Sequence, residues 1–203
     1  MKSKAGWIAL AGLLALPVAQ AGDLLLRAGV HDVSPKSNLE LKDAGISGVD
    51  VSDNATLSLG ATWFLTQNVA VDLLGAIPFR HDVKIGGTTV ATVKHLPPTL
   101  GVQYHFNPGG AFDPYVGAGV NVTFFFSEEA KGPLAGTDVS AGTSVGPALQ
   151  VGGDFALTKD WVLGLDVRWA KIGTEVKDNG VKLGTLDLDP FVYGITIGRR
   201  FSL

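Results

Sequence analysis

The chain has 203 residues, a net charge of −3 and no cysteine. The lack of cysteine excludes disulfides, thiolate metal sites and a lipidated N-terminal cysteine. The lack of a basic run or stripe argues against a nucleic-acid partner.

The N-terminus has the pattern of a processing signal. Two lysines precede an apolar run over residues 5–18, and Ala19-Gln20-Ala21 places small residues at the cleavage positions. The alternative, a transmembrane helix, needs about 20 apolar residues, and this run is shorter. We therefore expect residues 1–21 to be a cleaved signal peptide and residues 22–203 to be the mature protein, exported from the cytoplasm.

Eight segments of alternating apolar and polar residues follow, and a period of two is that of a β-strand. Short turns at residues 66–68, 107–114 and 158–160 alternate with four long connections. Three of these are residues 34–53, 82–96 and 127–143, and the fourth contains Asn179-Gly180, a dipeptide suited to a tight hairpin tip. In chain order, the predicted strands are residues 23–33, 55–65, 69–80, 100–106, 116–126, 145–157, 161–169 and 191–203.

This order predicts an all-β fold, an eight-stranded antiparallel up-and-down barrel with both termini at one end. A soluble barrel is apolar inside, whereas a transmembrane barrel is apolar outside. One face of the predicted strands is nearly all Leu, Val, Ala and aromatic residues, and the other carries glycines and charges. Glycines and paired charges fit a narrow lumen, while an Arg or Lys facing lipid at mid-depth costs about 2–4 kcal/mol. We therefore predict a transmembrane β-barrel whose lumen holds Arg27, Asp72, Asp154, Asp166, Arg168 and Arg200.

The aromatic residues agree with a barrel in lipid, because they gather near the two ends of the strands, where interfacial girdles are expected. Near the short turns lie Trp63, Tyr104, Phe106, Phe155, Trp161 and Phe201. Near the long connections lie Phe79, Phe124, Phe126, Trp169 and Phe191.

Six stretches resemble the OmpW family of bacterial outer-membrane proteins (OmpW/AlkL-like). They are LLLRAGVHDVSP, LLGAIPFRHDV, ATVKHLPPTLGVQYHF, FDPYVGAGVNVTFFF, LTKDW and LDPFVYGITIGRRF, and they follow the family's order over most of the mature chain. The family usually ends on an aromatic residue, whereas Ser202 and Leu203 follow Phe201 here. The resemblance implies an outer-membrane channel that passes small hydrophobic molecules from outside and releases them laterally into the membrane.

Four of the lumen charges are expected at a similar level near the short-turn end: Arg27, Asp72, Asp154 and Arg200. Opposite charges in a narrow lumen attract strongly, so these four are predicted to contact one another. The cluster either obstructs passage into the periplasm or simply fills the barrel. Above it, Leu74 and Phe125 break the polar-inside pattern, and with Leu96 they are predicted to line a hydrophobic funnel.

Pro97 and Pro98 stand at the start of the fourth predicted strand, where they have no N–H groups to pair. One interpretation is that they interrupt pairing between the third and fourth strands and mark a lateral opening. An interrupted ladder in lipid is tolerated only where the freed groups meet water or a cavity. The other interpretation is that the prolines begin the strand above the hydrocarbon.

Other functions are weighed against transport. His31, His81 and His95 lie without a nucleophile motif, so we expect neither an enzyme nor a metal site, and no cofactor. An alternative is a structural or interaction barrel whose extracellular loops serve adhesion or a receptor role. The expected partners are outer-membrane lipid and lipopolysaccharide, small hydrophobic solutes and the barrel-assembly machinery.

Overall fold

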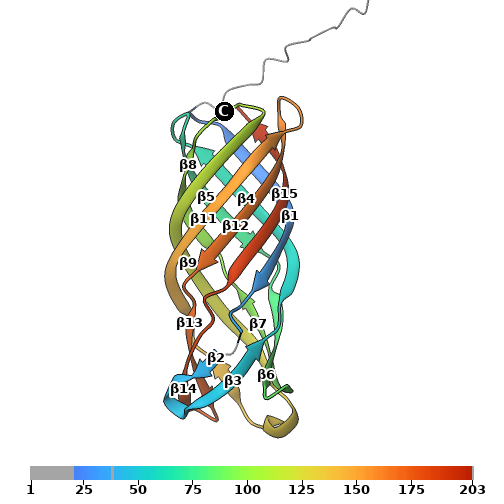
Figure 1. Cartoon of the computed structure of the whole chain (residues 1–203), viewed down its shortest axis with the longest axis vertical. Helices are drawn as coiled ribbons and strands as arrows, with labels where there is room; N and C mark the ends of the chain where they lie inside the picture. Colours follow the sequence, from blue (N-terminus) through green and yellow to red (C-terminus); the bar gives the residue numbers. More distant parts are fainter. Residues whose placement is uncertain (1–20, 38, 203) are drawn as a thin grey trace, which may run out of the picture.

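The protein is an elongated barrel in a computed structural model that describes residues 21–37 and 39–202 (Figure 1). The expected signal peptide, apart from Ala21, lies outside the described residues. Among the described residues, no helix is long and apolar enough to cross a membrane.

Eight antiparallel strands close on themselves in the order β11-β12-β15-β1-β4-β5-β8-β9, with β9 paired again to β11. Their bounds are β1 Leu24–Ser34, β4 Asn54–Phe64, β5 Val69–Ala76, β8 Thr99–His105, β9 Phe112–Ala130, β11 Ser144–Ala156, β12 Trp161–Ala170 and β15 Phe191–Phe201. Neighbours in the sequence are neighbours in the barrel, which confirms the predicted up-and-down topology. The C-terminus and the short turns lie at the same end, the periplasmic end of such barrels (Figure 1).

The outward and inward faces follow the predicted alternation in this part of the barrel. Large apolar side chains are exposed at every second position, as in Leu57, Leu59 and Leu149, because lipid rather than protein covers them. The intervening positions are buried and polar, as in Thr62 and Asp154. The face that carries the charges is therefore the lumen face, as the sequence predicts.

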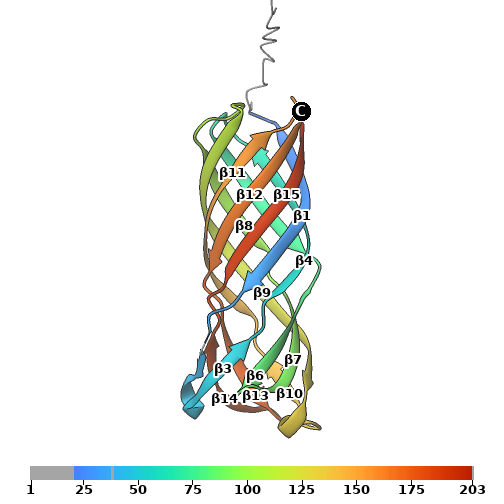
Figure 2. The ribbon, with the colours of Figure 1, turned by 45° about the vertical axis from the view of Figure 1, so that its right-hand side comes forward.

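The long connections are not the loops that the sequence analysis expects. They form seven more strands and two short 3-10 helices, which extend the barrel away from the C-terminal end (Figure 2). The strands are β2 Leu39–Leu41, β3 Ile46–Val51, β6 Phe79–Ile85, β7 Thr88–Leu96, β10 Val139–Ala141, β13 Gly173–Asp178 and β14 Val181–Asp187. The helices are η1 Lys42–Ala44 and η2 Gly132–Leu134.

The clearest correction concerns residues 82–96, which form most of the β6–β7 hairpin rather than a loop. The Asn179-Gly180 tip between β13 and β14 is confirmed, because both residues have the positive φ (48° and 78°) that a tight hairpin turn needs. The extension matters for function because it encloses space above the lipid-facing barrel.

The extension reverses the alternation of the membrane barrel. Phe79, predicted to be a lipid-facing girdle residue, is 2% exposed and points inward, while Arg80 is exposed. Pro78 separates β5 from β6, and the alternation changes face across it. Outside the hydrocarbon, water and headgroups surround the strands, so apolar side chains are buried only by turning inward. They form a core of Leu39, Leu41, Val49, Ala148, Ala170, Ile172, Leu186 and Leu188.

Candidate functional site

The lumen of the membrane barrel is crossed by a continuous network of charged side chains. Arg27 on β1 donates two hydrogen bonds to the Asp154 carboxylate on β11, at 2.6 and 2.7 Å. Its Nε lies 3.4 Å from Thr62 Oγ1, and that hydroxyl donates to Asp72 Oδ1 at 2.8 Å. Thr62 on β4 therefore links the Arg27–Asp154 ion pair to Asp72 on β5, which belongs to a second ion pair.

The second part of the network is centred on Arg168 of β12. Its Nη1 donates to Asp72 Oδ2 at 3.0 Å and its Nε to Asp166 Oδ1 at 2.8 Å. His31 Nε2 lies 3.3 Å from Asp166 Oδ2, and His31 Nδ1 lies 2.6 Å from Ser58 Oγ. We call Arg27, Asp72, Asp154, Asp166 and Arg168 the charged floor.

The predicted contacts are therefore met in part. Arg27 pairs with Asp154, but Asp72 pairs with Arg168 rather than with Arg200. Arg200 lies opposite Leu25, two residues nearer the strand end than Gly198, the partner of Arg27. Its guanidinium carbon is 5.3 Å from the centroid of the Phe64 ring. Parity along a strand predicted which side chains face the lumen, but not which of them meet.

Two features below the charged floor escaped the sequence analysis. One is an apolar cluster of Leu25, Phe64, Ala70 and Val162, four buried residues at the periplasmic end. Each stands at an inward position of its strand, so alternation gives a signal for them. Together with the charged floor, they fill the cross-section of the barrel near the short turns.

The other is a polar chain on β8 and β9. His105 Nδ1 is 2.8 Å from Asp113 Oδ2, and its Nε2 is 3.1 Å from Gln103 Oε1. Gln103 donates to Gln150 Oε1 at 3.0 Å. The four side chains stand on the neighbouring strands β8, β9 and β11, so this region of the lumen is polar.

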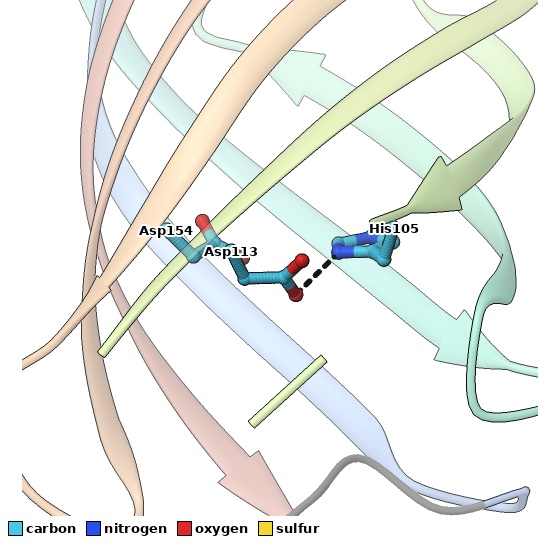
Figure 3. A group of neighbouring side chains, drawn as sticks. All are labelled: His105, Asp113 and Asp154. Carbon is cyan, nitrogen blue, oxygen red and sulfur yellow. Dashed lines mark hydrogen bonds and ion pairs between the residues drawn. The ribbon is translucent and has the colours of Figure 1, made fainter. Parts of the chain in front are cut away.

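His105, Asp113 and Asp154 form the group best suited by residue type to hold a metal ion, since their ligand atoms lie within 4.8 Å of one another (Figure 3). Figure 3 shows His105 directed at the Asp113 carboxylate, with Asp154 beside it. However, both Asp154 oxygens accept hydrogen bonds from Arg27, and both His105 nitrogens are in hydrogen-bond contacts. A cation would have to displace Arg27, so the donor set does not fit a metal site.

Two cavities lie beyond the charged floor, on its extracellular side. The middle cavity, about 40 Å³, is lined by Asp72 and Arg168 at the floor and by Leu74, His95 and Pro97. The outer cavity, about 190 Å³, lies inside the extension and has a mostly apolar lining that includes Phe125. Both cavities share four lining residues: Val33, His95, Ile172 and Pro190. The two cavities are therefore adjacent.

The barrel wall beside the middle cavity has a break in strand pairing. Pairing of β5 with β8 stops at Leu74 and Thr99, and pairing of β6 with β7 begins at Phe79 and His95. Within the described residues, the stretches in between, 75–78 and 96–98, have no register partner in each other. We call this break the wall gap.

Prolines explain why the ladder stops there. Pro78 lies on one side of the wall gap and Pro97 and Pro98 on the other, and none has an N–H to donate. Each side is instead held by its other neighbour: Ile77 N–H donates to Leu57 O, and Val122 N–H donates to Pro98 O. Leu57 and Leu100, near the gap, are 60% and 56% exposed. Apolar exposure of this kind indicates that the wall gap borders the hydrocarbon.

Of the three predicted funnel residues, the structure places Leu74 and Phe125 on the lumen side, in the linings of the middle and outer cavities. Leu96 is wrong as a funnel residue. It lines neither cavity and pairs with Phe124, whose side chain is exposed on the outer face. His95 and Pro97, its neighbours in the chain, take the inward positions instead.

Comparisons with known proteins match most of the chain. A model of the OmpW family matches residues 20–201. Outer membrane protein W of Salmonella typhimurium is 40% identical over 190 residues, which cover 90% of each chain. The dibenzothiophene metabolism operon protein PahQ of Pseudomonas aeruginosa is 28% identical over 180 residues, with 84% of this chain and 82% of that one covered. The crystal structure of outer membrane protein OprG from Pseudomonas aeruginosa superposes with a TM-score of 0.79 at 30% identity, covering 91% of this chain and 98% of that one.

Proposed function

We propose that this chain, which belongs to the OmpW family of bacterial outer-membrane proteins, is a passive channel for small hydrophobic molecules that releases them through the wall gap into the membrane. The observation that carries the proposal is the break in pairing at residues 75–78 and 96–98, beside a cavity in the lumen. The name of the relative PahQ, which refers to the metabolism of an apolar aromatic compound, supports it.

The charged floor makes sideways release the lower-energy route. An apolar solute that continued along the axis would have to separate the Arg27–Asp154 and Arg168–Asp72 ion pairs. Breaking a buried pair costs about 3–5 kcal/mol when one partner is left uncompensated. The wall gap has no ladder hydrogen bonds to break, and beyond it lies hydrocarbon in which an apolar solute is favourably dissolved.

The outer cavity provides the entrance on this route. Its lining of Val, Leu, Ile and Phe side chains binds apolar solute by removing its surface from water. The middle cavity continues to Pro97 at the wall gap. We therefore propose Leu74 and Phe125 as residues that contact the solute, and Pro97 and Pro98 as the edge of the exit.

A disulfide across the wall gap tests this route directly, because the chain has no cysteine of its own. Ala76→Cys with Pro97→Cys places one thiol on each side of the gap, both beside the middle cavity. The full-length protein is placed in an outer membrane that contains lipopolysaccharide, and uptake of a labelled alkane is measured before and after oxidation. Oxidation should slow uptake and reduction should restore it, while single-channel ion conductance should stay constant.

A second disulfide provides the control. Leu73 and Leu100 are register partners in the continuous part of the β5–β8 ladder, so Leu73→Cys with Leu100→Cys joins strands that are already paired. Oxidation of this variant should leave uptake unchanged. Mass spectrometry shows whether the Ala76–Pro97 disulfide forms. If it forms and alkane uptake is as fast as in the protein with free thiols, lateral release is refuted. If uptake does not depend on the protein at all, the alternative of an adhesion or receptor barrel gains support.

A further inference from the structure

Two histidines form an unusual polar feature where the outer and middle cavities meet. His81 on β6 and His95 on β7 are 3% and 5% exposed. Their rings stack nearly parallel, with an interplanar angle of 7° and centroids 4.8 Å apart. Both line the outer cavity, and His95 also lines the middle one. His95 therefore lies where the two cavities adjoin, and His81 is stacked on it from the side of the outer cavity.

The Nε2 atoms of both rings are buried and have no hydrogen-bond partner among the described residues. A buried polar atom without a partner is unfavourable, because it has lost its hydrogen bonds to water and gained none from the protein. Around the pair are Phe79, stacked on both rings, and Phe125, tilted against His95. Neither phenyl ring offers a hydrogen bond in the ring plane, so a partner has to be a molecule that enters the cavity, either water or the hydroxyl group of a solute.

The tautomer of His81 follows from its other nitrogen. His81 Nδ1 is hydrogen-bonded to the backbone carbonyl oxygen of Ser52, which only accepts, so Nδ1 carries the proton. Burial lowers the pKa of His81, and the aspartates near it oppose this shift without outweighing it. Burial lowers the pKa of His95 as well. In the neutral state of His81, Nε2 is a bare acceptor that needs a donor.

A metal ion does not fit the pair. Each nitrogen lone pair lies in the plane of its own ring, and two stacked rings do not direct their lone pairs at one point. No carboxylate is among the hydrogen-bond contacts of either Nε2 to complete a ligand set. A hydroxyl group does fit, because it needs only one ring: it donates a hydrogen bond to the His81 acceptor, or it donates to or accepts from His95 Nε2 according to the tautomer of that ring.

We infer that the His81–His95 pair recognises the hydroxyl group of an apolar solute, so that the channel favours long-chain alcohols and phenols over hydrocarbons of the same size. This inference rests on the proposed function, since it assigns a substrate class to the same route. An alcohol that reaches the pair gives Nε2 a hydrogen bond. An alkane in the same place leaves Nε2 without a partner. The apolar cavity holds the rest of the molecule: about 190 Å³ exceeds the ~150 Å³ of an engineered cavity that binds benzene.

Two solutes of equal heavy-atom number, 1-decanol and n-undecane, test the inference. Labelled uptake of each is measured in cells whose outer membrane carries the full-length protein, and the alcohol-to-alkane ratio is compared with that of the His81→Phe, His95→Phe double variant. The variant keeps two stacked rings and removes the nitrogens. The alcohol-to-alkane ratio should fall by about threefold to tenfold, the value of one hydrogen bond, and it is this ratio rather than the uptake of either solute alone that is compared. Phe79→Leu, which alters the same stack without touching a nitrogen, should leave the ratio as in the wild type.

A measurement on the wild-type protein makes the test independent of transport and of variant folding. Imidazole nitrogen-15 NMR in lipid nanodiscs reports whether His81 Nε2 accepts a hydrogen bond. Decanol should move this resonance in the direction of hydrogen bonding, and undecane should not. A resonance that decanol leaves in place, or a ratio that the double variant leaves unchanged, overturns the inference. If neither solute needs the protein for uptake but decanol still moves the resonance, the proposed channel fails while the hydroxyl site stands.

Discussion

Replacing Asp154 by alanine should destabilise the barrel by about 3–5 kcal/mol, because the change leaves the Arg27 guanidinium buried without its carboxylate. Arg27 is 7% exposed and Asp154 is 2% exposed, so water does not readily take the place of the lost partner. The two hydrogen bonds lost, at 2.6 and 2.7 Å, are charge-assisted and contribute about 1.5–3 kcal/mol each. Thr62 gives only a longer contact, 3.4 Å, in compensation.

Removing both charges together separates the contribution of the ion pair from the cost of leaving one charge unpaired. Arg27→Met with Asp154→Leu removes both charges and fills their space, and it should recover most of the lost stability. Asp154→Asn keeps the shape and one acceptor, so its free energy of unfolding should lie between those of the wild type and the alanine variant. Urea unfolding in lipid vesicles, followed by tryptophan fluorescence and by gel mobility of the folded form, measures all four proteins.

The contrary outcome is clear. If Asp154→Ala lies within about 1 kcal/mol of the wild type, in the range of an exposed ion pair, the charged floor is hydrated and does not close the lumen. Passage along the barrel axis would then compete with lateral release. Because the lumen would be open in the wild type as well, the single-channel conductance of the two proteins should be similar.

Two further predictions concern the solute route, and a third concerns the stability of the extension in acid. Leu74→Asn or Phe125→Ser should slow alkane uptake severalfold without unfolding the barrel, because each adds a polar group to an apolar lining; equal uptake would remove these residues from the route. Pro97→Val with Pro98→Thr should slow uptake if hydrogen exchange shows new hydrogen bonds between the strands on either side of the wall gap, although Pro78 still lacks a donor on the opposite side. Full uptake in a variant with such a continuous ladder would contradict release through the wall gap. Acidification should weaken the extension, because burial lowers the pKa of His81 in the folded protein. The contribution of neutral His81 to the free energy of unfolding is complete above its unfolded-state pKa of about 6.5 and is lost as the pH falls toward its folded-state pKa. The protection factors of the β6 and β7 amides, which correct for the slower intrinsic exchange in acid, should therefore fall below that pH, and His81→Phe should remove part of the dependence.

The sequence by itself determined the membrane part of this fold. Lipid outside and a narrow lumen inside impose opposite demands on alternate residues, so period two alone assigns Leu59 to the lipid and Asp72 to the lumen. Short turns between long alternating segments then leave up-and-down pairing as the simplest topology. The lumen position of all six charged residues follows from the same alternation. The missing N–H groups of Pro97 and Pro98 allowed a pairing break as one of two interpretations, and the turn preference of Asn179-Gly180 predicted the hairpin tip.

Only the tertiary structure decided which lumen residues meet. Asp72 finds Arg168 and not Arg200, because contacts across the lumen depend on the stagger of strands that are far apart in the barrel. Parity carries no information on that stagger. The extension was hidden for a related reason: beyond Pro78 the surroundings change from lipid to water, and the apolar face turns from outside to inside. The alternation of the membrane strands therefore put Phe79 on the wrong face. Leu96 was assigned to the funnel from a segment expected to be a loop, whereas alternation counted back from Leu100 puts it on the outer face. The stacked pair of His81 and His95 became visible only once the β6–β7 hairpin had brought the two side chains to one cavity.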